Sequence, residues 1–331
     1  MSNTTTLEEV VPSLNIQEIK DNKDKIKDIK LLLIKKNSDF SDGYEPIKAL
    51  IHKNIYPKII DIYMNNNLDV ILKDNEFDKL SYDVNDDSVI PYLKFTDLND
   101  NTLFRLLNES INNLDDIDSF TDLNTALSKS YLYAFIFTLE NHKTFTIIRK
   151  ISSSNYLKNK GLLCLTGGRL NFIQENLFSL DSKVDCILYD NLIYIVGKYN
   201  FETLFSYRTH YTNEAQKTLS IINQHSIIAN FENFSTDCLQ RSSMIKKLAE
   251  LQNSGELTSF ISKLNTDPKL VEKTIKKYNL DITLEDKKIV YKDLSSLSEI
   301  VNLISENYFE SDLSHKLCLA KGKKYIPRVT K

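Results

Sequence analysis

The amino-acid sequence predicts an α+β fold: a central antiparallel β-sheet of hairpins covered by helices, with a separate N-terminal α/β region and a helical C-terminal part. Three consecutive hairpin signals between residues 131 and 196 predict the sheet. An apolar helical stripe after Gly197 predicts its cover, because a sheet with an apolar face must bury that face against a second layer. We therefore expect an antiparallel sheet of at least five strands within 131–197.

The N-terminal region has weaker patterns. An apolar run at 31–34 predicts a strand, and fainter strand patterns lie near 47–51 and 68–72. Leucine and isoleucine at helical spacing predict an amphipathic helix over 101–114. The Asp and Asn residues just before this helix suit an N-cap.

The acidic stretch 113–124 is the predicted loop and domain boundary, which divides the chain into 1–125 and 126–331. Residues 1–130 have 24 Asp and Glu against 15 Lys and Arg, a balance of −9. Residues 131–331 have 21 against 27, a balance of +6. The two halves are therefore expected to meet different partners, with protein contacts assigned to the acidic N-terminal half, although ordinary surface charge explains the same numbers.

The three hairpins are recognised by β-branched and aromatic residues on both sides of a short turn. Their turns lie at 140–143, Gly167-Gly168 and Asp190-Asn191. Gly197 ends the third hairpin and permits the turn into a helix. That helix has apolar residues at core spacing, namely Phe201, Leu204 and Phe205.

Helical patterns continue through the C-terminal part, over 213–224, 238–252 and 257–264. A further helix is expected to begin at Pro268, with Asp267 as its N-cap. Two short strands around 285–288 and a last helix over 295–309 complete the chain. Helix, helix and hairpin also follow one another in winged-helix modules.

Two classes of targeting segment are not found in the sequence. The first residues do not combine the basic and apolar regions of a signal peptide, and the longest apolar run, 131–139, is shorter than the roughly 18 residues that span a bilayer. We therefore expect a cytoplasmic protein without direct membrane insertion. The four cysteines have no zinc-ligand spacing, and Cys164 and Cys186 are expected to be buried thiols.

No catalytic motif occurs, so we predict no catalytic residue, no metal and no cofactor. His210 is expected at a surface between two helices. An alternative is a metal-dependent nuclease, in which an acid and an Asp/Glu-x-Lys pair on core strands hold Mg²⁺. This Asp/Glu-x-Lys pattern occurs at Asp21/Lys23, Asp28/Lys30 and Glu285/Lys287. In a chain rich in Lys and Asp, the pattern also arises by chance.

Ordered basic residues in the second half predict duplex DNA binding. Lys269, Lys273, Lys276 and Lys277 fall at i, i+4, i+7 and i+8, so they share one helix face. The next turn and the acid-free C-terminal stretch add Lys287, Lys288, Lys321, Lys323, Lys324 and Arg328. Such groups neutralise phosphates without reading bases. The alternative is a solvated helix face and a frayed tail.

One order of motifs carries a family resemblance. A strand pair ends at 149–151, and 180–205 then carries an Asp-hairpin-Phe-Glu pattern. A late hairpin at 282–291, a helix and the terminal segment 312–326 follow. In this order the stretch from about 126 to 325 resembles the KwaB-like proteins of the Kiwa anti-phage defence system.

This resemblance implies a prokaryotic antiviral defence effector that binds duplex DNA. It also implies a homo-oligomer that works with a small membrane-spanning, KwaA-like partner and is recruited by it to the inner face of the membrane. A non-enzymatic structural assembly protein is a further alternative. Asp185 and Glu202 bracket the third hairpin and could be active-site acids. We favour structural roles: Asp185 as a turn cap or a partner of Arg149 or Arg169, and Glu202 in the first turn of its helix.

Overall fold

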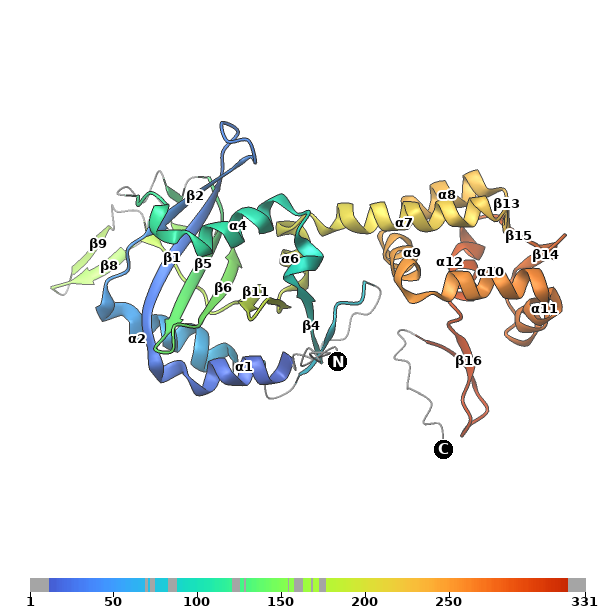
Figure 1. Ribbon diagram of the computed structural model, residues 1–331, viewed down its shortest axis with the longest axis horizontal. Helices are drawn as coiled ribbons and strands as arrows, with labels where there is room; N and C mark the ends of the chain where they lie inside the picture. Colours follow the sequence, from blue (N-terminus) through green and yellow to red (C-terminus); the bar gives the residue numbers. More distant parts are fainter. Residues whose placement is uncertain are drawn as a thin grey trace, which may run out of the picture. The chain divides into compact units, whose positions relative to one another are not determined.

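The computed structural model describes residues 12–68, 71, 75–82, 88–120, 126–127, 129–153, 155–157, 163–167, 169–172 and 177–320. The chain divides into two compact units (Figure 1). The first comprises Met1–Leu80 and Asp87–Phe205, and the second Ser81–Asp86 and Ser206–Lys331. These units do not coincide with the predicted ranges 1–125 and 126–331, because strands from both sides of residue 125 pair in one sheet.

The first unit is built on an eight-stranded sheet in the order β2-β1-β5-β6-β11-β12-β4-β3. Only β3 and β4 pair in parallel; all other neighbours are antiparallel. The strands are β1 (Ile26–Lys36), β2 (Tyr44–Ala49), β3 (Glu76–Lys79), β4 (Val89–Lys94), β5 (Ser130–Leu139), β6 (Thr144–Lys150), β11 (Cys186–Tyr189) and β12 (Leu192–Ile195). The prediction of a separate N-terminal α/β region was therefore wrong, because β1 lies between β2 and β5.

The predicted hairpins form, but they do not all join this sheet. The first is β5–β6 and the third is β11–β12, whose turn residues Asp190 and Asn191 have φ values of 49° and 61°, as a type I′ turn requires. The second, β8 (Leu163–Thr166) with β9 (Arg169–Phe172), is a sheet of its own. So is β7 (Tyr156–Leu157) with β10 (Leu177–Phe178). Four strands within 131–197, not five, join the central sheet, because β11 occupies the free edge of β6.

Helices cover both faces of the central sheet (Figure 1). One face packs against α1 (Pro12–Asp21), α2 (Tyr56–Ile60) and the π-helix η3 (Asp61–Leu68). The other is covered by α4 (Thr102–Asn112) and α6 (Lys198–Leu204), where Phe104 and Phe205 have ring centroids 6.0 Å apart. Because both faces are covered, every residue of β11 and β12 is buried.

Several local predictions in the first unit can be compared with the structure. Phe201 is 0% exposed, so the helix after Gly197 does cover apolar surface. The helix predicted over 101–114 is α4, and Asn101 caps it by accepting from the Phe104 N–H at 3.0 Å. The strand predicted near 68–72 was wrong: Leu68 ends η3 and Ile71 is helical. Short 3₁₀ helices complete the unit: η1 (Lys23–Lys25), η2 (Lys53–Ile55), η4 (Phe95–Leu98) and η5 (Leu114–Asp116).

The second unit is mainly helical. Its helices are α7 (Tyr207–Gln224), α8 (Phe231–Leu239), α9 (Ser242–Ser254), α10 (Glu256–Thr266), α11 (Pro268–Lys277) and α12 (Leu294–Ile304). Three short strands, β13 (Ile228–Ala229), β14 (Thr283–Glu285) and β15 (Lys288–Val290), form one sheet in which β13 lies parallel to β15. A separate hairpin pairs β16 (Tyr308–Glu310) with β17 (Leu317–Leu319). The last helix ends at Ile304 rather than 309, because β16 begins at Tyr308. Among the described residues, no helix is long and apolar enough to cross a membrane.

Candidate nucleic-acid interface

Helix α11 presents the predicted basic face. Asp267 accepts from the Leu270 N–H at 3.2 Å and caps the helix, and Pro268 occupies its first position. Val271 and Ile275 are buried. At about 100° per residue, the four predicted lysines span about 100° of arc on the opposite side. All four are exposed: Lys269, Lys273, Lys276 and Lys277.

The four lysines differ in their partners. Lys277 Nζ lies 2.6 Å from Glu310 Oε2, and this hydrogen bond raises the pKa of Lys277 and lowers the pKa of Glu310. Within the described part of the chain, Lys269, Lys273 and Lys276 have no carboxylate oxygen within 4.0 Å. One exposed acid, Glu272, shares the helix. The face therefore offers three cations that carry no ion pair.

The turn between β14 and β15 lies close to the N-terminal end of α11. Lys287 Nζ donates to the backbone oxygen of Asn265 at 3.4 Å, and Asn265 immediately precedes the last residue of α10, Thr266. Lys287 and Lys288 are both exposed. The structure thus places the Lys287 ammonium near the end of α10, shortly before α11 begins. The other predicted contacts, Lys321, Lys323, Lys324 and Arg328, lie outside the described residues.

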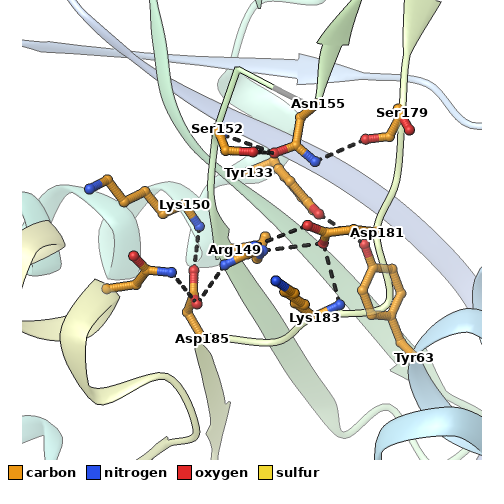
Figure 2. Close-up of polar contacts among 11 residues, drawn as sticks. Tyr63, Tyr133, Arg149, Lys150, Ser152, Asn155, Ser179, Asp181, Lys183 and Asp185 are labelled. Carbon is orange, nitrogen blue, oxygen red and sulfur yellow. Dashed lines mark hydrogen bonds and ion pairs between the residues drawn. The ribbon is translucent and has the colours of Figure 1, made fainter.

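The first unit holds a buried polar cluster around Asp185 (Figure 2). The Asp185 side chain is 2% exposed and accepts three hydrogen bonds. Its Oδ1 accepts from Arg149 Nη1 and Asn200 Nδ2, each at 2.8 Å, and its Oδ2 accepts from the Lys150 N–H at 2.7 Å. The predicted pairing of Asp185 with Arg149 is confirmed. Both carboxylate oxygens are already occupied by donors, so the arrangement orders β6, β11 and α6 against one another.

Gly197 is required by the same carboxylate. A Cβ atom at this position would lie 2.6 Å from Asp185 Oδ1, far closer than any ordinary contact. The Asp185 backbone oxygen also accepts the N–H groups of Val196 and Gly197, both at 2.9 Å. The sequence predicted Gly197 as a turn residue. Its φ of −106° lies outside the left-handed region, so the glycine is needed because the Asp185 carboxylate approaches its Cα so closely.

Asp181 completes the cluster, a role that the sequence pattern had not indicated. It binds Arg149 with both oxygens, at 3.2 Å from Nε and 3.0 Å from Nη2, and its side chain is 30% exposed (Figure 2). Burial opposes charge on the Arg149 guanidinium, but the two carboxylates outweigh it, so the pKa of Arg149 is raised. The sequence signal that could have indicated the role of Asp181 is its position four residues before Asp185, in the segment that leads into the same strand.

Beside this cluster, two buried tyrosines are joined by a hydrogen bond. The hydroxyl oxygens of Tyr63 and Tyr133 lie 3.1 Å apart, which joins η3 to β5. Burial raises the pKa of Tyr63 to about 12 and raises the pKa of Tyr133 further. Both phenols therefore stay protonated at neutral pH.

Glu202 and His210 do not lie where the sequence predicted. Glu202 is the fifth residue of α6, so it is not in the first turn, because the helix begins at Lys198. His210 lies within α7 rather than between helices, and its Nε2 is 3.0 Å from the Tyr82 hydroxyl. Burial lowers the pKa of His210. A buried aromatic cluster of Tyr82, Tyr207 and Tyr211 surrounds its ring.

The Asp/Glu-x-Lys pairs do not gather into a site. Asp28 accepts from the Tyr56 hydroxyl at 2.6 Å, whereas Lys30 pairs with Asp115 at 2.9 Å. In the ranges that the structure describes, no three His, Cys, Asp or Glu side chains lie close enough together to hold a metal ion. Cys186, whose burial was predicted, is buried, and the pKa of its thiol is raised well above the usual value by desolvation. The side chain of Cys164 lies outside the described residues.

Comparisons with known proteins give one match. No curated protein and no solved structure is significantly similar to this chain. A family model described as Kiwa protein KwaB-like matches residues 127–314, more than half of the chain. This range contains the Arg149–Asp185 cluster and the basic face of α11. The chain therefore belongs to the KwaB-like family of Kiwa proteins.

Proposed function

We propose that this protein acts in Kiwa anti-phage defence by binding duplex DNA through its phosphates, largely without sequence specificity. Membership of the KwaB-like family implies the role in anti-phage defence. The observation that supports DNA binding is the basic face of α11, where Lys269, Lys273 and Lys276 are exposed without an ion pair among the described residues. Unpaired, exposed cations keep their full charge for an external anion.

The dimensions of this face suit a phosphate backbone. The nine residues from Lys269 to Lys277 are separated by eight helical rises and span about 12 Å along the helix axis. Duplex DNA presents one phosphate charge per roughly 1.7 Å of axis, so several phosphates lie within reach. The exposed pair Lys287 and Lys288 is proposed to extend this track, supported by the bond of Lys287 to Asn265 just before α11. Lysines act as point charges here, and such contacts position a protein without reading sequence.

The proposal includes a small membrane-spanning, KwaA-like partner that recruits a homo-oligomer of this chain to the inner face of the membrane. Support comes from the family match and from the finding that no helix among the described residues could cross a membrane itself. The acidic balance of residues 1–130, −9, favours protein contacts over nucleic acid in that part of the chain.

The test is a duplex titration that compares two triple variants with the same charge change. K269E/K273E/K276E reverses the unpaired cations of α11. K53E/K58E/K79E reverses three exposed lysines of the first unit. A random-sequence duplex is titrated at several salt concentrations, with and without Mg²⁺.

We expect the α11 variant to weaken binding to every duplex alike and to lower the salt slope by about three, one for each phosphate contact. The control should change the slope by less than one. Equal effects of the two variants would show that only net charge matters. Cleavage of the duplex in Mg²⁺ would favour the nuclease instead.

A further inference from the structure

The hairpin β16–β17 exposes an unusual amount of apolar side chain. Ten large hydrophobic residues are exposed in the described part of the chain, and four of them lie within residues 309–319. They are Phe309 (47% exposed), Leu313 (98%), Leu317 (50%) and Leu319 (51%). Single exposed leucines are ordinary, but a group on one small element marks an interaction surface.

The base of this hairpin is held against α11, whereas the described residues of its loop, 311–316, make their hydrogen bonds within the hairpin. Tyr308 packs on Tyr278 with ring centroids 5.3 Å apart, and Glu310 pairs with Lys277 at 2.6 Å. The Ala320 N–H donates to the Asn307 oxygen at 2.8 Å. Leu313 lies in the loop that joins the strands, where turns normally carry polar residues. The hairpin therefore presents an anchored stem with an apolar tip.

The charge of the sequence from the tip onward favours an anionic partner. After Asp312 the sequence contains no acid up to Lys331, and Lys316 is exposed in the loop itself. The nearest other acid, Glu310, faces Lys277 and His315. Within the described loop, 311–316, aliphatic Leu313 is thus accompanied by one lysine, Lys316, and one acid, Asp312, and the sequence that follows the hairpin, 321–331, adds five basic residues and no acid.

We propose that the β16–β17 hairpin docks on an anionic phospholipid bilayer, with Leu313 and Leu317 among the acyl chains and Lys316 at the lipid phosphates. A phosphate backbone alone offers the leucines no apolar contact. A protein partner would need an apolar hollow that fits a protruding loop, whereas a bilayer accommodates apolar side chains in any arrangement. Apolar insertion together with basic residues is how peripheral proteins bind anionic membranes. This contact needs no partner protein.

The test uses the purified full chain and two kinds of vesicle, phosphatidylcholine alone and phosphatidylcholine mixed with phosphatidylglycerol. We expect co-sedimentation with the mixed vesicles and much less with the neutral ones. L313S/L317S should weaken binding to mixed vesicles at least about tenfold, since burying one leucine side chain contributes that much. L50S/L294S is the matched control, because Leu50 is 83% and Leu294 47% exposed elsewhere in the chain.

Several results would overturn this assignment. One is no binding to mixed vesicles; another is binding that both double variants weaken equally or that L313S/L317S leaves unchanged. If L313S/L317S instead weakens duplex binding more than a few-fold, the tip belongs to the DNA surface. If it converts an oligomer to a smaller species without any vesicle effect, a second copy covers the tip. Unchanged duplex binding and an unchanged melting temperature in L313S/L317S are part of the expected result.

Discussion

Replacing Asp185 by Asn would test the buried cluster of the first unit. The carboxylate accepts two donors at Oδ1 and one at Oδ2, and the side chain is 2% exposed. An Asn side chain has the same shape but exchanges one acceptor oxygen for an NH₂ donor. In either orientation of the amide, at least one of the three donors then faces another donor.

The expected cost follows from these contacts. A buried donor without a partner costs about 1–3 kcal/mol, and the lost charge-assisted bond to Arg149 adds about 1.5–3 kcal/mol. We therefore expect Asp185→Asn to lower the free energy of unfolding by about 3–5 kcal/mol, as for other broken buried ion pairs. Asp181→Asn is the control, with an expected loss of about 1 kcal/mol, because Asp181 is 30% exposed and water can replace part of its bonding.

Urea denaturation of both variants measures the difference, provided that the m value does not change. A loss below about 1 kcal/mol for Asp185→Asn, or an equal loss for both variants, would refute the reasoning. While folded, Asp185→Asn and Glu202→Gln should bind duplex within a few-fold of wild type. Metal-dependent DNA cleavage that either substitution abolishes would give these acids a catalytic role instead.

Four further predictions concern single side chains. Gly197→Ala should destabilise the first unit in urea denaturation, because its Cβ would lie 2.6 Å from Asp185 Oδ1, and a wild-type midpoint would contradict this. Phe201→Ala should cost about 3–5 kcal/mol, since Phe201 is 0% exposed, and an unchanged melting temperature would show that it is not core. Glu310→Gln should free Lys277 and strengthen duplex binding with a steeper salt slope; weaker binding would argue against the α11 face. Burial lowers the pKa of His210, so neutral His210 contributes to stability above about pH 6.5, the pKa of the unfolded state. This contribution is lost as the pH falls below that value toward the pKa of the folded state. His210→Gln should remove this part of the pH dependence of the free energy of unfolding.

Much of the local structure was predictable because its causes are local. The turn at Asp190-Asn191 needs two residues that tolerate positive φ, and both are written in the sequence. The N-caps Asn101 and Asp267 each act on a backbone N–H three residues along the chain. The lysine face of α11 follows from the helical period alone.

The candidate sites were only partly predictable. Asp185 was recognised with Arg149 as one of two possible partners, whereas Asp181 was missed, because it lies in a loop whose path to the guanidinium no local sequence pattern specifies. The exposure of Lys269, Lys273 and Lys276 follows from the pattern of α11, but the ion pair between Lys277 and Glu310 does not. Those two residues are brought together by the packing of the β16–β17 hairpin on the end of α11.

The hairpins, the caps and the basic helix face could be predicted from the sequence, since each depends on residues within a few positions of one another, and the α+β class follows from them. Three features depend on contacts between distant segments and became clear in the folded chain: β1 pairs with β5, β6 pairs with β11 rather than with the second hairpin, and both sheet faces are covered. Every strand edge offers the same backbone donors and acceptors, so the partner of an edge is chosen by the burial of apolar faces across the whole unit.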